Sequence, residues 1–161
     1  MKIVKAVNLK KYFVTENYEV HAVDGVTLEI EEGEFVAVVG TSGSGKTSLL
    51  NLLGGLDVPD EGGVWIRGSS LKDMESEERT IFRRRNIGFI FQQFNLLPVL
   101  TAKENIIMPL LLDKQKPDEA YLKQLTELLG IQGRLEHLPH ELSGGQQQRV
   151  AIARALIAKP D

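Results

Sequence analysis

Residues 40–47 restrict what this chain can fold into more than any other segment. They read Gly-Thr-Ser-Gly-Ser-Gly-Lys-Thr, a full match to the pattern G-x-x-x-x-G-K-[ST]. The apolar run 35–39 precedes the match, and the helix-like run 48–53 follows it. A loop that wraps a phosphate must bring several backbone N–H groups to one point, which glycines allow because they have no Cβ. The segment therefore predicts a phosphate-binding loop between a strand and a helix.

Each position in this loop has an expected role. Three glycines supply the conformational freedom, and the start of the following helix adds unpaired N–H groups and the positive end of its dipole. We expect Lys46 to reach the β- and γ-phosphates of a nucleotide and Thr47 to ligate Mg²⁺. The residues expected to contact the nucleotide here are Gly40, Thr41, Ser42, Gly43, Ser44, Gly45, Lys46, Thr47 and Ser48. The alternative, a glycine-rich turn without a ligand, is disfavoured by the strand before the loop and the helix after it.

Composition limits the class of protein. With 161 residues, 42% of them apolar and 25% charged, the chain can form one domain with a core, which excludes a disordered class. The net charge of −3 gives no general attraction to nucleic acid or anionic lipid, so we expect no nucleic-acid partner. The absence of cysteine excludes disulfides and thiolate metal sites. The arginines at 83–85 are expected to end a helix, where cations are favourable.

No membrane-targeting or membrane-spanning segment is expected. No signal peptide is visible at the start of the sequence, and the longest apolar stretch, 106–112, is too short to span a bilayer. Any association with a membrane would therefore depend on a partner.

The first part of the chain has the pattern of strands. Apolar alternation or β-branched runs predict strands at 3–14, 20–23, 26–30, 35–39, 64–67 and 87–91, with turns at 16–17, 24–25 and 32–33. The run 35–39 is apolar throughout, which is typical of a central strand covered on both faces. A helix is expected at 76–85.

Residues 101–129 change to a helical period. Thr101 and Glu104 form a capping-box pattern. The segment 116–119 is expected to open a second helix, with Pro117 at its first position. Tyr121, Leu125, Leu128 and Leu129 are expected on one face of that helix, with Gly130 closing it. A helical block thus follows a nucleotide-binding sheet.

A second motif precedes the expected helix 146–158. It reads Leu-Ser-Gly-Gly-Gln at 142–146 and continues to Arg149. Ser143 and Gln146 alone could be a helix cap without a ligand. The serine hydroxyl, the N–H groups of Gly144 and Gly145 and the helix start could equally receive a phosphate. The loop upstream favours the second interpretation.

These motifs resemble those of the ATP-binding subunits of ABC transporters, over essentially all of 1–161. Residues 40–47 match the Walker A loop and 142–146 the signature motif. Residues 87–92, followed by 93–98, resemble the Q-loop, which would make Gln92 a catalytic residue near Mg²⁺ and the γ-phosphate. Tyr12 matches the aromatic that stacks on adenine. The sequence around these motifs is most similar to that of the family branch whose members release lipoproteins or export macrolides and antimicrobial peptides.

The resemblance implies an α/β fold. It would be a P-loop NTPase core, with a mixed sheet and an antiparallel N-terminal β-subdomain, plus an inserted helical subdomain. We expect a single nucleotide-binding domain with its core at 1–92, its helical subdomain at 93–141, and the signature motif and helix at 142–161.

The resemblance also implies a partner and a location. In this family two subunits pair head to tail, so that ATP held by Lys46 of one is closed over by Ser143, Gly145 and Gln146 of the other. The second subunit would be a homodimer partner or another ATP-binding subunit. Both would bind transmembrane permease subunits at the cytoplasmic, inner face of the cell membrane and couple ATP binding and hydrolysis to export or release of a substrate.

One departure from the family pattern concerns residues 159–161. In the family a hydrophobic strand follows, and it ends in the Walker B aspartate and a catalytic glutamate, with a switch histidine further on. The histidines of this chain, at 21, 137 and 140, match no switch position. We therefore expect a domain whose C-terminal part is missing, with negligible ATP hydrolysis by this chain alone and low stability.

Two alternatives stay open. The chain could be a non-transport ABC ATPase of DNA repair or translation, although these usually insert a long coiled coil or carry two nucleotide-binding domains. It could also be a truncated nucleotide-binding fragment without hydrolysis.

Overall fold

The computed structural model describes residues 1–15 and 17–160, which form two compact units. The first is Met1–Arg79 and the second Thr80–Asp161. The division falls inside helix α2, Ser76–Asn86, upstream of the boundary that the sequence predicted after Gln92. The described part of the chain contains no helix that is both long enough and apolar enough to cross a bilayer.

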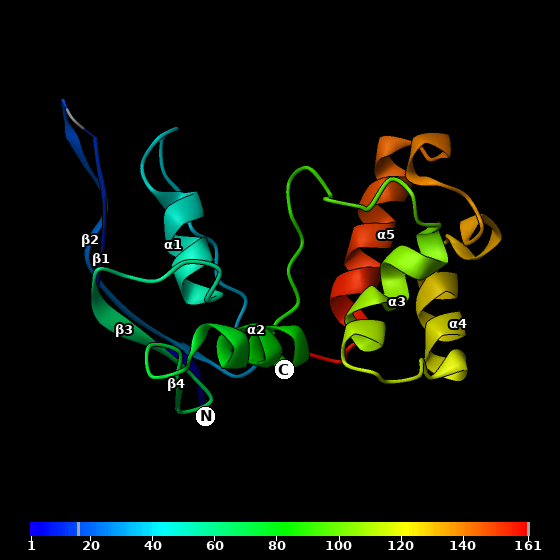
Figure 1. The fold of residues 1–161 in the computed structure, drawn as a ribbon, viewed down its shortest axis with the longest axis horizontal. Helices are drawn as coiled ribbons and strands as arrows, with labels where there is room; N and C mark the ends of the chain where they lie inside the picture. The colour runs from blue at the N-terminus through cyan, green and yellow to red at the C-terminus, as the bar shows by residue number, and fades with distance from the viewer. Residues whose placement is uncertain (16, 161) are drawn as a thin grey trace. The chain divides into compact units, whose positions relative to one another are not determined.

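The first unit is built on an antiparallel sheet with the strand order β2-β1-β3-β4 (Figure 1). Its strands are β1 Lys2–Val14, β2 Glu19–Glu31, β3 Glu61–Ile66 and β4 Ser69–Ser70. Helix α1, Lys46–Leu53, contacts both β1 and β2. The core residues of this unit are Ala6, Leu9, Val23, Leu52, Val64, Ile66 and Leu71. The antiparallel β-subdomain expected for the N-terminal part is therefore present.

Strand β2 is continuous where the sequence predicted two strands. The predicted turn at 24–25 is instead a bulge, because the pairing with β1 passes from Leu9↔Val26 to Lys10↔Asp24 and skips Gly25. Gly25 has φ 75°, a conformation that glycine adopts without strain. The predicted turn at 16–17 joins β1 to β2, and its first residue lies outside the described residues.

Two segments predicted as strands are not strands in the structure. Residues 35–39 and 87–91 are extended or irregular, and no strand among the described residues pairs with either. The apolar side chains of 35–39 are correspondingly uncovered: Phe35 is 98% exposed and Val39 85% exposed. A strand needs a neighbour to take its N–H and C=O groups, so apolar composition alone does not produce one.

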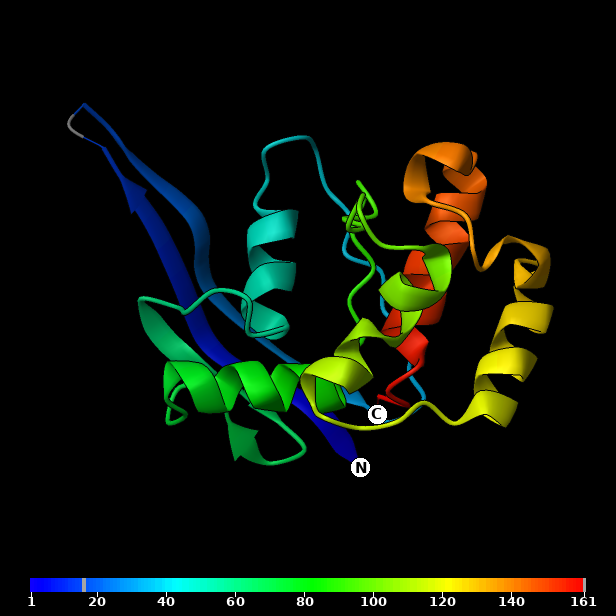
Figure 2. The ribbon, with the colours of Figure 1, turned by 45° about the vertical axis from the view of Figure 1, so that its right-hand side comes forward.

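The second unit is helical (Figures 1 and 2). Its elements are α3 Ala102–Leu112, α4 Glu119–Leu128, the 3₁₀ turns η1 Gln132–Arg134 and η2 Pro139–Glu141, and α5 Gly144–Leu156. Helices α3 and α5 pack against each other. The core residues of this unit are Ala102, Ile106, Leu110, Leu122, Leu125, Ile131, Leu142, Val150, Ala153 and Ile157.

The start of α3 follows the sequence prediction, and the details of α4 differ from it. The capping box of α3 is present, with the amide of Glu104 donating to Thr101 Oγ1 at 3.2 Å. In α4 the cap is Asp118, so Pro117 lies before the helix and not at its first position. Leu128 is 82% exposed, and Leu122 takes a place on the buried face instead. The reason is that, at about 100° per residue, Leu125 is offset from Leu122 by only about 60° around the helix, whereas Leu128 is offset by about 120° and falls on another side.

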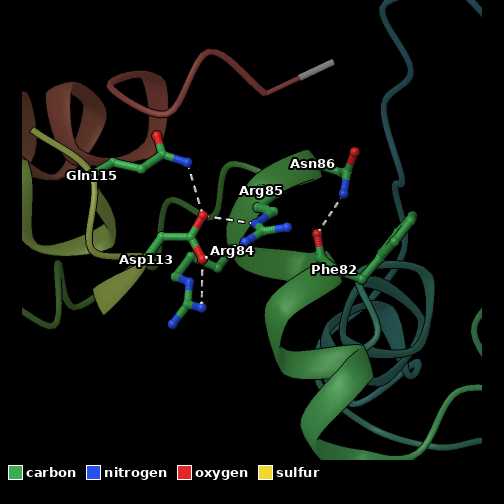
Figure 3. Close-up of polar contacts among 6 residues, drawn as sticks. All are labelled: Phe82, Arg84, Arg85, Asn86, Asp113 and Gln115. Carbon is green, nitrogen blue, oxygen red and sulfur yellow. Dashed lines mark hydrogen bonds and ion pairs between the residues drawn. The ribbon is translucent and has the colours of Figure 1, made fainter. Parts of the chain in front are cut away.

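Asp113, at the end of α3, binds the last turn of α2 (Figure 3). Arg85 donates from Nε and Nη2 to the two carboxylate oxygens, at 2.7 and 3.0 Å. Arg84 Nη2 donates at 2.8 Å and Gln115 Nε2 at 2.9 Å. The carboxylate is only 6% exposed. The hydrogen bond from Arg85, helped by Arg84, lowers the pKa of Asp113 against the opposing effect of burial. The predicted arginine run thus ends its helix and also joins two helices.

We expect Asp113→Asn to destabilise the protein in a pH-dependent way. Because the pKa of Asp113 is lower in the folded state, its contribution is complete above the ordinary value of 3.8 and is lost as the pH falls through the folded value. Urea unfolding at stepped pH values from 7 downward should show a lower midpoint for the variant at pH 7 and a smaller difference at the lowest pH. The exposed Asp73→Asn is the matched control. A difference that stays constant with pH would contradict the assignment.

Candidate nucleotide-binding site

The loop at 40–47 has the backbone that its glycines were expected to allow. Gly43 and Gly45 have φ 79° and 84°. A Cβ on Gly45 would collide with the carbonyl oxygen of Ala22 in β2, so only glycine fits at this point. Gly45 is also the N-cap of α1 and has no side chain to cap it. The first N–H groups of α1 are therefore left for another partner.

An open pocket of about 460 Å³ lies at this helix start. It brings together seven of the nine residues that the sequence predicted for the nucleotide at 40–48. From the loop and helix its lining residues are Ser42, Gly43, Ser44, Gly45, Lys46, Thr47 and Ser48, and from the β1–β2 hairpin they are Phe13, Val20 and Ala22. Hydroxyl groups, glycine amides and one ammonium thus share a single cavity.

The Lys46 ammonium is held inside the loop. Its Nζ donates to the carbonyl oxygen of Gly40 at 2.9 Å, to that of Thr41 at 2.6 Å and to Ser44 Oγ at 3.3 Å. Gly40 and Thr41, which do not line the pocket, therefore contribute through these carbonyls. An ammonium has three donors and no acceptor, so all three face oxygen atoms here.

The structure places Tyr12 away from this pocket. Its hydroxyl donates to Asp24 Oδ1 at 3.2 Å, and its ring lies 4.3 Å from that of His21. Burial, together with the hydrogen bond to Asp24, raises the pKa of Tyr12. The next residue, Phe13, lines the pocket and is 47% exposed. Neighbouring side chains of a strand point to opposite faces, which explains why only one of the two reaches the loop.

Gln92 lies in the second unit, at an exposed turn after residues 87–91. The amide of Phe94 donates to the carbonyl of Phe91 at 3.1 Å and closes this turn. Phe94 and Asn95 have φ 60° and 48°. Their carbonyl oxygens accept hydrogen bonds from Arg154 of α5, each at 2.6 Å.

The second motif forms the start of α5, also in the second unit. Ser143 is the N-cap: its Oγ accepts from the amide of Gln146 at 3.3 Å, and its own amide donates to Gln146 Oε1 at 2.8 Å. The capping box predicted for Ser143 and Gln146 is therefore present. Gly144 and Gly145 are exposed at the first helical positions, and a Cβ on Gly144 would meet nothing within 4 Å. The helix start is thus open to solvent within its unit.

A metal ion would have few protein ligands here. Across residues 1–15 and 17–160, no three His, Cys, Asp or Glu side chains gather as a metal site. The hydroxyl of Thr47 in the pocket is an oxygen donor of the type that Mg²⁺ prefers, and Mg²⁺ commonly takes its other ligands from phosphates and water.

Sequence reasoning missed two residues. Phe13 adjoins the predicted aromatic, and the alternation along β1 could have flagged it. Arg154 lies 59 residues after Asn95, and no local pattern links the two positions.

Comparison with known proteins places these features in one family. The family model for the ABC transporter matches residues 23–161. An uncharacterized ABC transporter ATP-binding protein, MJ1508 from Methanocaldococcus jannaschii, is 48% identical over 98% of this chain and 71% of its own length. The lipoprotein-releasing system ATP-binding protein LolD of Pseudomonas syringae is 50% identical over 95% of this chain and 68% of its own. The macrolide export ATP-binding/permease protein MacB of Bdellovibrio bacteriovorus is 44% identical over 94% of this chain and 23% of its own.

Solved structures agree with the sequence comparison. The dimeric structure of MJ0796, described as a bacterial ABC transporter cassette, matches with a TM-score of 0.88 and 44% identity over 98% of this chain and 70% of that one. A second structure of MJ0796, a post-hydrolysis state bound to ADP and Pi, matches equally well, with a TM-score of 0.88 and 45% identity over the same shares. The expected α/β fold class and the expected family are therefore confirmed, and the chain belongs to the ABC transporter family.

Proposed function

We propose that this chain is an ATP-binding subunit of an ABC transporter and couples ATP binding and hydrolysis to the export or release of a substrate through separate membrane subunits. The observation that carries the proposal is the Lys46 ammonium, surrounded by oxygen acceptors beside the uncapped start of α1. That arrangement suits a triphosphate, because phosphate oxygens accept from an ammonium and from helix N-terminal amides.

The phosphates would lie along residues 40–48. Lys46 would exchange its contacts with the carbonyls of Gly40 and Thr41 for contacts with phosphate oxygens, which carry charge and accept more strongly. Thr47 would hold Mg²⁺, and Gln92 would add a carbonyl oxygen near this ion and the γ-phosphate. A bound Mg²⁺ would neutralise charge on the phosphates.

The base would stack on an aromatic side chain of β1. The resemblance to the family names Tyr12 for this role, whereas the pocket geometry favours Phe13. Phe13 and Val20 are partly exposed and line the same cavity as the phosphate loop, and Tyr12 is engaged with His21 and Asp24.

A second subunit would close the site. Ser143, Gly144, Gly145 and Gln146 would meet the ATP held by Lys46 of the other copy or of another ATP-binding subunit. Gly144 and Gly145 offer exposed amides at the start of α5, and the solved relative MJ0796 is dimeric. We place the assembly at the cytoplasmic face of a membrane, bound to permease subunits, by analogy with relatives such as LolD and MacB.

The helix lengths favour transport over a role in DNA repair. Between the two motifs the described helices are short, with 11 residues in each of α2 and α3. No long coiled coil is inserted among the described residues at 48–142, although such an insertion is usual in the ABC ATPases of DNA repair.

We expect Lys46→Ala to weaken ATP binding by about 10- to 100-fold, since a hydrogen bond to a charged group contributes about 1.5–3 kcal/mol. Calorimetry with Mg-ATP measures the affinity. The exposed Lys72→Ala is the charge-matched control and should bind like the wild type. Equal affinity of Lys46→Ala and wild type would exclude the loop as the phosphate site.

Calorimetry with Mg-ATP also distinguishes the roles of Phe13 and Tyr12. Phe13→Ala should weaken ATP binding by about 5- to 100-fold, the effect of losing one aromatic–base stack, and should leave the affinity for inorganic triphosphate unchanged. Tyr12→Ala should have the smaller effect on ATP affinity. The reverse order would return the base-stacking role to Tyr12.

A further inference from the structure

Arg154, near the end of α5, holds the loop that follows Gln92. Its Nη2 donates to the carbonyl of Phe94 and its Nη1 to the carbonyl of Asn95, both at 2.6 Å. The guanidinium is half-buried, and burial lowers its pKa, but arginine stays charged in proteins. A charge removed from water in this way needs hydrogen-bond partners, and the two carbonyls supply them.

Two residues of this loop have an unusual backbone conformation. Phe94 and Asn95 are consecutive residues with φ 60° and 48°, and a bulky residue such as phenylalanine rarely adopts that conformation. Together they turn two carbonyls toward one guanidinium. The planar fork of arginine can span two acceptors at once, which the single nitrogen of a lysine does not do in the same geometry.

The segment before Gln92 is attached to the same helix. A Cβ on Gly88 would lie only 2.6 Å from the carbonyl oxygen of Ala155, so the backbone there lies directly against α5. Further upstream, Asp113 holds Arg84 and Arg85 (Figure 3). Gln92 therefore sits on a segment that the second unit holds on both sides.

We propose that Arg154 is a positioning residue for Gln92. It would fix the place of Gln92 relative to α5, the helix that starts with the second motif at 143–146. A displacement of α5 would then move Gln92 with it, so that engagement of the helix start would change what Gln92 contacts. This inference rests on the proposed function, because it assigns Gln92 a part in binding Mg²⁺ and the γ-phosphate.

Arg154→Lys tests the proposal, since it keeps the charge and the aliphatic stem but loses the double contact. Hydrogen exchange should be about tenfold faster at the amides of 92–97 and unchanged in α3. The second readout is how much Mg²⁺ strengthens ATP binding, measured as the dissociation constant in EDTA divided by the dissociation constant in Mg²⁺. In Arg154→Lys this ratio should fall from the wild-type value to the value of Gln92→Ala. The double variant, with both Arg154→Lys and Gln92→Ala, should have the same ratio as Gln92→Ala alone. The control is Arg134→Lys, an exposed arginine of the same unit, which should leave both readouts unchanged.

Each outcome has a defined meaning. Unchanged exchange at 92–97 in Arg154→Lys would overturn the proposal, and so would faster exchange with a wild-type Mg²⁺ ratio. If the wild type bound no ATP, the proposed function would fail. If Gln92→Ala left the Mg²⁺ ratio unchanged, the role assigned to Gln92 would fail. In both cases the hydrogen-exchange data would still decide whether Arg154 holds the loop. If Arg154→Lys does not fold, Arg154→Gln, which keeps a single donor group, replaces it with the same expected changes.

Discussion

The close approach of Gly45 to the carbonyl of Ala22 is the constraint on which the candidate nucleotide site depends. It joins the start of α1 to strand β2 at a distance that excludes a Cβ. As a result the amides at the start of α1, the ammonium of Lys46 and the side chains of Phe13 and Val20 share one cavity. The glycine that the sequence pattern predicts for a phosphate loop is thus also required by the packing of the hairpin against the helix.

The second unit arranges its functional groups around one helix. Ser143 caps the start of α5, Val150 and Ala153 face the core, and Arg154 binds the loop after Gln92. Because an α-helix is stiff over such a length, a group at its start and a group near its end keep a fixed relation. The two motifs of this unit are therefore mechanically connected without touching each other's side chains.

Local patterns located the pocket-lining loop at 42–48 and most of the helices. The capping boxes at Thr101 and Ser143 are present, because each depends on residues three positions apart. The helix 76–85 and the helix after the phosphate loop agree with the structure to within one or two residues. Strand predictions were less successful: 35–39 has the right composition but no partner among the described strands, and Gly25 forms a bulge where a turn was expected.

The sequence by itself determined the glycine-rich loop with its lysine and threonine, the two helix starts and the family, since short runs of adjacent residues specify all of these. Only the tertiary structure decided that Phe13 and not Tyr12 faces the pocket, that Asp113 binds Arg84 and Arg85, and that Arg154 holds the loop after Gln92. The physical reason is that alternation along β1 separates Phe13 from Tyr12 without saying which face meets the loop, and that the other contacts depend on where the chain returns after tens of residues.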